Sequence, residues 1–66
     1  MINHIKALRK ERGITQDELA MAVGVTRQTV ISLENGKYNA SLQLAFKLSA
    51  YFALPIEHIF EMEEEV

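Results

Sequence analysis

Residues 26–36, TRQTVISLENG, combine a compact set of hydrogen-bonding side chains with clear helix boundaries. Thr26 is a residue type that caps helix starts and Gly36 one that follows helix ends, so a single short helix is predicted between them. Val30 and Leu33 fall on its apolar side. The side chains on its other face are Arg27, Gln28, Thr29 and Ser32. Lys and Glu would suffice for solubility, so this face predicts a surface for hydrogen-bond recognition.

The preceding segment has a still stronger start signal. Thr15 and Glu18 form a capping box, in which each side chain satisfies a backbone N–H near the other. Gly24 ends that helix where a left-handed residue is needed. Only Gly24 and Val25 separate this stop from Thr26, so the two short helices must meet at a sharp angle. This pattern is the helix-turn-helix signature.

Three further helices complete an all-α domain. They are predicted over residues 4–12 with Asn3 as N-cap and Gly13 as stop, from the Ser41 cap to about Ala53, and from Pro55 to about Ile59. The fourth of the five helices has an apolar stripe too wide for one small core. Its members are Leu42, Leu44, Ala45, Leu48 and Phe52.

The end of the chain, HIFEMEEEV, supports two interpretations. Phe60 and Met62 alternate with Glu61 and Glu63, as in a strand with one buried face, and the starting residues MIN could pair with it. The other interpretation is a frayed terminus. The residue pattern alone leaves both open.

Length and composition narrow the class of protein. The 66 residues make one domain of marginal stability, and self-association is the expected source of additional stability. The absence of Cys excludes disulfides and thiolate metal sites, and two isolated His residues cannot supply a zinc site. No apolar run approaches the roughly 20 residues of a membrane span, and no signal peptide is evident. We therefore expect a soluble, intracellular protein that does not associate with a membrane and binds no cofactor, metal or small-molecule ligand.

The net charge of -2 conceals an asymmetry. Residues 1–38 hold six basic and four acidic side chains, a net charge of +2, whereas residues 39–66 hold one basic and five acidic, a net charge of -4. This predicts a basic working face and an acidic far end. Lys6, Lys10 and Arg12 of the first helix are expected mainly to supply long-range attraction.

Six positions at fixed spacing support the helix-turn-helix interpretation: Gln16, Ala20, Gly24, Val25, Val30 and Leu33. Through these positions, the segment 15–60 resembles the Cro/repressor (XRE) family of prokaryotic and phage transcription regulators. The resemblance covers nearly the whole chain, from Ile5 to Phe60. The resemblance implies a five-helix, lambda-repressor-like domain over residues 1–66 with its helix-turn-helix core at about 15–35. Some compact members add a two-stranded terminal β-ribbon, which favours the strand interpretation of the tail.

The resemblance also implies that the third helix enters the major groove of double-stranded DNA. Arg27 and Gln28 match base-reading positions of the family; Arg can grip guanine and Gln adenine. Ser32 matches another, shorter-reaching position, and Ile31 beside it would meet a thymine methyl group. The positions that match the phosphate-binding shell are Gln16, Thr26, Thr29, Asn35, Lys37, Tyr38 and Ser41. Arg9 and Glu34 match an ion pair that would orient the recognition helix from behind.

Apolar residues beyond the needs of a small core predict a homodimer. The spare residues are Leu44, Leu54, Ile56, Phe60 and Met62. We expect the interface at about residues 54–62 beside the loop, formed by Asn39, Ala40, Leu54, Ile56, Phe60 and Met62. Such a dimer would place two recognition helices about 34 Å apart, one turn of B-DNA.

These expectations converge on a dimeric repressor that reads a near-palindromic operator in the prokaryotic or phage-infected cytoplasm, associated with the nucleoid when bound. Repression needs no further domain, because a dimer bound at a promoter can exclude polymerase. The alternative is an antitoxin that binds a toxin protein and regulates its own operon. An enzyme is not expected, because no catalytic constellation is present.

Overall fold

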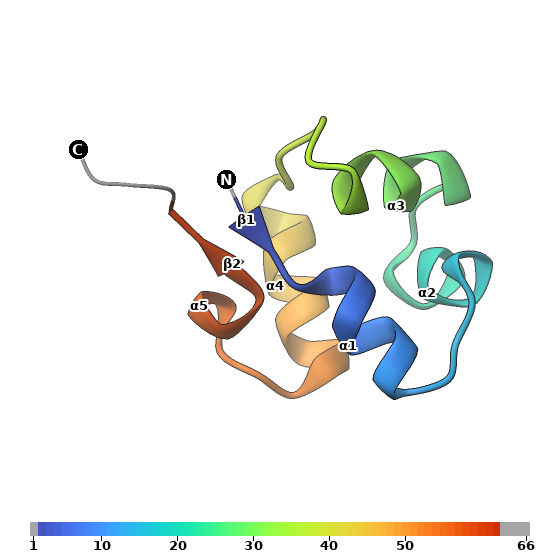
Figure 1. The fold of residues 1–66 in the computed structure, drawn as a ribbon, viewed down its shortest axis with the longest axis horizontal. Helices are drawn as coiled ribbons and strands as arrows, with labels where there is room; N and C mark the ends of the chain where they lie inside the picture. The colour runs from blue at the N-terminus through green and yellow to red at the C-terminus, as the bar shows by residue number, and fades with distance from the viewer. Residues whose placement is uncertain (1, 63–66) are drawn as a thin grey trace.

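The computed structural model describes residues 2–62, which form five helices and a small terminal ribbon (Figure 1). In chain order the elements are β1 (Ile2–Asn3), α1 (Ile5–Glu11), α2 (Gln16–Val23), α3 (Arg27–Glu34), α4 (Leu42–Phe52), α5 (Ile56–Ile59) and β2 (Phe60–Glu61). The predicted all-α fold with five helices is confirmed, and the helix boundaries lie within one or two residues of those expected.

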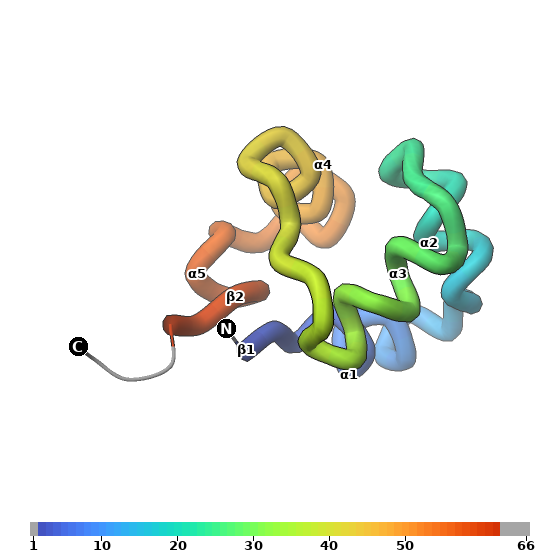
Figure 2. Tube along the Cα trace, turned by 90° about the horizontal axis from the view of Figure 1, so that it is seen from above, coloured from blue at the N-terminus to red at the C-terminus, as the bar shows by residue number. Residues whose placement is uncertain are grey.

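The boundaries of α2 and α3 follow from local capping. Thr15 Oγ1 accepts a hydrogen bond from Glu18 N at 3.0 Å, and Glu18 Oε1 accepts one from Thr15 N at 2.8 Å, so the predicted capping box is present. Gly24 has a left-handed backbone with φ of 74°. Thr26 Oγ1 accepts from Thr29 N at 3.2 Å and starts α3. Figure 2 shows α2 and α3 close together on one side of the molecule.

The terminal ribbon is antiparallel, with Ile2 opposite Glu61 and Asn3 opposite Phe60. The strand interpretation of the tail is therefore correct for residues 60–61, whereas residues 63–66 lie outside the described part of the chain. His4 N also donates to the Ile59 carbonyl at 2.8 Å. The ribbon joins the two ends of the domain beside α5 (Figure 1).

The core lies where the inner faces of the five helices meet. Its fully buried side chains are Ile5, Leu19, Val30, Leu33, Leu48 and Ile59. Leu44 is also buried, so its assignment to spare surface is wrong, and Leu54 is half-buried against the core. Leu42, which was expected in the same stripe, is instead 71% exposed. The buried stripe of α4 is narrower than the sequence suggested, because Leu42 lies at the surface, where it lines an apolar groove.

Arg12 closes the end of α4, a role that the expectation of long-range attraction missed. Its Nη2 donates to the Phe52 carbonyl at 2.8 Å, and its guanidinium lies 5.5 Å from the Tyr51 ring centroid and 5.3 Å from that of Phe52. The last carbonyls of a helix lack intrahelical partners, and a cation there also complements the helix dipole. Arg12 therefore secures α1 to α4.

Candidate nucleic-acid interface

The outer face of α3 is uncovered in the described part of the chain. Arg27 and Gln28 are exposed in its first turn, and Thr29, Ile31 and Ser32 are half-buried. Its opposite face is fixed by Val30 and Leu33, which are buried in the core. Figure 1 shows α3 along the upper edge, with α2 and α4 beneath it. The packing thus presents the predicted base-reading side chains together on one rigid, outward face.

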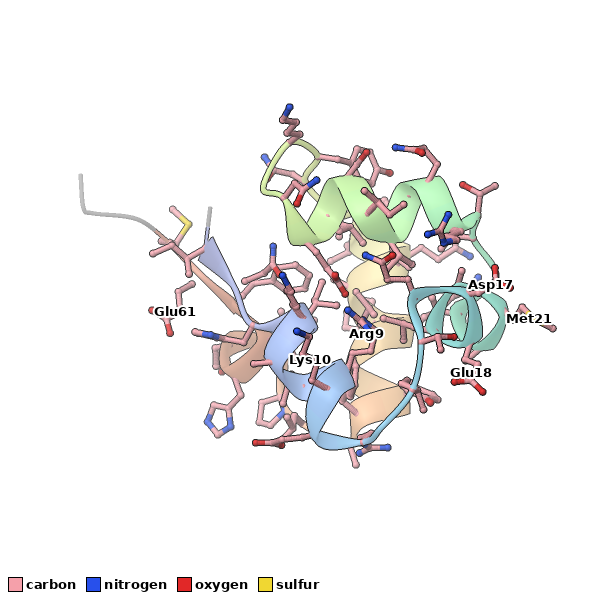
Figure 3. All side chains as sticks on the ribbon, turned by 45° about the vertical axis from the view of Figure 1, so that its right-hand side comes forward. Arg9, Lys10, Asp17, Glu18, Met21 and Glu61 are labelled. Carbon is pink, nitrogen blue, oxygen red and sulfur yellow. The ribbon has the colours of Figure 1, made fainter. Side chains whose placement is uncertain are left out.

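A buried carboxylate joins the two ends of the helix-turn-helix unit. Arg9 Nε donates to Glu34 Oε2 at 2.7 Å and its Nη2 to Glu34 Oε1 at 3.2 Å, while the Glu34 side chain is only 3% exposed. Arg9 Nη1 also donates to the Ile14 carbonyl at 3.0 Å. In Figure 3, Arg9 points inward among α1, α2 and α3. The structure therefore brings together the two side chains expected to pair.

Gln16 belongs to this network as well. Its Nε2 donates to Glu34 Oε1 at 3.1 Å, so the first residue of α2 is tied to the last residue of α3. The sequence suggested a phosphate contact for Gln16 and no internal partner. The amide of Gln16 retains a second N–H, so it can donate to a phosphate while it is held by Glu34.

The network changes the electrostatics of Glu34. Burial by itself raises the pKa of this carboxyl, but the hydrogen bonds from Arg9 and Gln16, together with the positive charges of Arg9 and Lys6, outweigh burial and hold the pKa below its usual range. The hydrogen bond to Glu34 is also the main reason why the pKa of Arg9 is raised. Both groups are therefore charged at neutral pH, and the pair is a fixed feature of the site.

The predicted phosphate-binding residues lie at the ends of the helices that flank this face. Asn35, Lys37 and Tyr38 are exposed in the loop after α3. The hydroxyls of Thr26 and Ser41 accept hydrogen bonds from Thr29 N at 3.2 Å and Leu44 N at 3.1 Å, which cap α3 and α4. A hydroxyl that accepts from a backbone N–H still has its own hydrogen to donate, so capping is compatible with phosphate binding at Ser41. The Thr26 hydroxyl also lies 3.1 Å from the Thr29 hydroxyl, and either of these two can be the donor.

An apolar groove of about 450 Å³ lies at a different part of the surface, between the start of α4, α5 and β2. Its lining residues are Ala40, Leu42, Ala45, Ile56, Glu57, Phe60, Glu61 and Met62. Four of the six predicted dimer residues therefore line one groove, whereas Leu54 packs against the core and Asn39 is exposed outside the lining.

Leu42 and Phe46 add exposed apolar surface that the predicted dimer interface did not include. They lie four residues apart on α4 and are 71% and 59% exposed, and Leu42 also lines the groove. Residues four apart lie on the same face of a helix, and the pair Leu42 and Phe46 is offset by two positions from the buried pair Leu44 and Leu48. This offset was the signal in the sequence that the two pairs lie on different faces of α4. The face of α4 opposite the core is thus apolar at its start.

Comparison with known proteins agrees with this geometry. The Helix-turn-helix family model matches residues 5–59. The chain is 46% identical over 65 residues to an uncharacterised HTH-type transcriptional regulator of Methanocaldococcus jannaschii, with 98% of each chain covered. It is 32% identical over 60 residues to the cryptic phage CTXphi transcriptional repressor RstR of Vibrio cholerae. That alignment covers 91% of this chain and 54% of RstR. Antitoxin HipB of Escherichia coli is 38% identical over 48 residues, 73% of this chain and 51% of HipB.

The fold and the exposed α3 face define a DNA-binding helix-turn-helix domain. The chain belongs to the helix-turn-helix family of the Cro/repressor (XRE) type, which is a family of DNA-binding transcription regulators. No helix within residues 2–62 has the length and apolar character that crossing a membrane requires.

Proposed function

We propose that the protein is a dimeric repressor that reads a near-palindromic operator with α3. The observation that carries this proposal is the placement of Arg27 and Gln28, exposed in the first turn of a helix whose other face is buried by Val30 and Leu33. In helix-turn-helix proteins the first turns of the second helix contact base edges in the major groove. Family membership supports DNA as the partner.

Base reading in this proposal divides among four side chains. Arg27 can donate two hydrogen bonds to guanine O6 and N7, and Gln28 can pair with adenine N6 and N7. Ser32 lies about one turn further along the same face, with a shorter reach and less selectivity. Ile31 would contact a thymine methyl group, because its side chain is apolar and half-buried at the edge of the reading face.

Phosphate contacts would fix the register of α3 without reading sequence. The proposed residues are Gln16, Thr26, Thr29, Asn35, Lys37, Tyr38 and Ser41. They flank the reading face at the start of α2, the two ends of α3 and the start of α4. The N-terminus of α2 adds backbone N–H groups and a partial positive charge that favour an anion.

The second copy of the chain would cover the apolar groove. Ile56, Phe60 and Met62 would form the centre of that interface, within the proposed dimerisation region of residues 54–62, with Asn39, Ala40 and Leu54 at its margin. In such a two-fold dimer the two reading helices would lie about 34 Å apart, the distance between successive major-groove sites on one side of B-DNA.

Repression follows with the fewest further assumptions. A bound dimer excludes polymerase from a promoter without another domain, and the Vibrio cholerae relative is described as a transcriptional repressor. The protein would then act in the cytoplasm, at the nucleoid. In this proposal, residues 1–66 form one DNA-binding domain, and its helix-turn-helix core spans residues 15–35 approximately.

An antitoxin is the second candidate function, and the similarity to HipB favours it. In that case the apolar groove would bind a toxin protein, and DNA binding would regulate the operon. A repressor remains the better fit, since the Methanocaldococcus jannaschii and Vibrio cholerae relatives are described as a transcriptional regulator and a transcriptional repressor.

Selection of bound duplexes from a random-sequence pool tests the proposal directly. We expect a selected site with two similar half-sites about 10 base pairs apart, centre to centre. The protein bound to that duplex should sediment as a dimer. Recovery of a single half-site, or of no preferred sequence, would contradict the proposed dimeric reading of an operator.

A further inference from the structure

Asn3 lies between the terminal ribbon and the end of α3. Its Nδ2 donates to the Leu33 carbonyl at 2.8 Å, and its Oδ1 accepts from Ile5 N at 3.1 Å. One partner is an acceptor and the other a donor, so both ends of the side-chain amide are satisfied in a single orientation. Figure 2 shows β1 beside the turn at which α3 ends. One half-buried side chain thus connects three elements.

The Leu33 carbonyl is a sensitive position in the recognition helix. The last carbonyls of a helix have no partner in the next turn, and this one accepts from Gly36 N at 3.0 Å in addition to Asn3. Gly36 has a φ of 73°, so the chain turns here into the loop that carries Lys37 and Tyr38. Asn3 therefore holds the point from which the proposed phosphate-binding loop begins.

Two elements grip consecutive residues at this end of α3. Asn3 of β1 binds the main chain of Leu33, and Arg9 of α1 binds the side chain of Glu34. The backbone of Asn3 also pairs with that of Phe60, which lines the apolar groove. Asn3 thereby contacts both a residue of the groove and the end of the recognition helix.

We propose that Asn3 is a positioning residue for DNA recognition: it fixes the end of α3 and the loop after it relative to the terminal ribbon. This inference rests on the proposed function, because it assigns the positioning to DNA reading by α3. In a dimer joined at the ribbon, the same contact sets the direction in which each α3 points. Arg9 holds the side chain of Glu34, whereas Asn3 holds the main chain at Leu33.

Three variants separate this role from ordinary stabilisation. Asn3→Ser keeps a short acceptor near Ile5 N but cannot reach the Leu33 carbonyl, and it leaves the net charge unchanged. Asn3→Ala removes both hydrogen bonds. Ser49→Ala is the matched control, since Ser49 Oγ donates to the Leu54 carbonyl at 2.5 Å and so also links a side chain to a backbone carbonyl, at the end of α4.

The probe is the duplex that the wild-type protein selects from random DNA, titrated at a temperature at which circular dichroism shows each variant fully folded. We expect Asn3→Ser to weaken binding roughly threefold to tenfold, the range that follows from one lost hydrogen bond. Asn3→Ala should weaken binding at least as much. Ser49→Ala should stay within about twofold of wild type while its unfolding temperature falls.

Amide hydrogen exchange supplies a second readout that needs no DNA. Asn3→Ser should speed exchange at Gly36 and Lys37, whose N–H groups bond the carbonyls of Leu33 and Ser32 at 3.0 Å, and Ser49→Ala should not. Equal DNA affinity for Asn3→Ser and wild type, equal weakening by Ser49→Ala, or unchanged exchange at both amides would overturn the inference. If the wild-type protein selects no DNA sequence, the proposed function fails by itself, and the exchange data still decide whether Asn3 holds α3.

Discussion

Glu34 is the side chain on which three helices depend. It ends α3, receives Arg9 from α1 and Gln16 from α2, and is almost inaccessible to water. A buried charge pair gains little over a well-packed apolar pair, but removal of one partner leaves the other charge buried and unpaired. The pair therefore serves orientation of α3 more than overall stability.

Glu34→Gln should consequently lower the free energy of unfolding by about 3 kcal/mol at neutral pH, because the Arg9 charge loses its counter-ion. Urea unfolding monitored by circular dichroism measures this loss. Arg9→Met combined with Glu34→Leu serves as the control, since neither charge remains and much of the stability should return. A loss in the double variant as large as in Glu34→Gln would show that packing, and not the unpaired charge, is responsible.

The depressed pKa of Glu34 makes part of this stability dependent on pH. Because the folded-state pKa lies below the unfolded value of about 4.3, the contribution is complete above that value and is lost as the pH falls through the folded-state pKa. We therefore expect the free energies of unfolding of wild type and Glu34→Gln to converge as the pH is lowered from 5 toward the folded-state pKa. A constant difference across this range would mean that the pKa of Glu34 is the same in the folded and the unfolded protein.

Arg27 and Lys37 are expected to differ in what they contribute to DNA binding. Arg27→Ala should relax the preference at one operator position, at a cost of about 1–3 kcal/mol against the preferred base. Lys37→Ala should weaken all duplexes alike and reduce the salt dependence of binding by about one phosphate contact. Footprinting titrations on the selected site and its single-base variants distinguish these effects. Unchanged operator binding by Arg27→Ala would mean that the reading face is assigned wrongly.

At the scale of elements, the turn between α2 and α3 sets the angle at which the reading helix leaves the domain. Gly24 adopts a left-handed backbone there, and Val25 N donates to the Ala20 carbonyl at 2.9 Å. Outside the adjoining residues, the atom nearest to a Cβ at Gly24 would be the Lys47 Nζ at 3.8 Å, which is an ordinary contact distance. The requirement for Gly is therefore one of backbone conformation and not of space.

Gly24→Ala should accordingly destabilise the protein by about 1–2 kcal/mol, the cost of a left-handed backbone for an L-residue. Gly24→Asn should cost less, because Asn tolerates this conformation. The midpoint of urea unfolding, at an unchanged slope, reports both values. An equal loss for the two variants would instead indicate a packing conflict with the side chain.

At the scale of the whole molecule, the proposed reading surface and the proposed assembly surface occupy different sides. The apolar groove lies beside α5 and β2, and the polar face of α3 lies along the upper edge of Figure 1. Leu42 and Met62 at the groove are 71% and 82% exposed. A chain this small needs its apolar side chains for its own core, so two large ones left exposed together are notable. Such a patch is a typical site of association.

Leu42→Gln combined with Met62→Gln should convert the proposed dimer to a monomer while changing the stability of the monomer fold by no more than about 0.5 kcal/mol for each exposed site. Sedimentation at micromolar concentration measures the first effect and thermal unfolding the second. Met21→Gln is the matched control, because Met21 is 78% exposed on α2 and points away from the groove (Figure 3). A wild-type protein that is monomeric both with and without DNA would contradict the proposed dimer.

Local interactions made much of this fold predictable. The capping box of Thr15 and Glu18, the left-handed turn at Gly24 and the cap at Thr26 each involve residues within four positions of one another, so residue type and spacing suffice. The same reasoning indicated which face of α3 is buried. It also grouped Arg27 and Gln28 on the outer face, which is the basis of the candidate site.

Contacts between distant residues were decided only by the tertiary structure. Whether Leu42 or Leu44 enters the core depends on how α4 is rotated against its neighbours, and the amide of Asn3 meets a carbonyl thirty positions away. Arg12 likewise reaches the end of α4, which no local pattern indicates. The sequence by itself determined the helices and the character of their faces, since those depend on near neighbours; packing determined how the faces are combined, because it depends on every element at once.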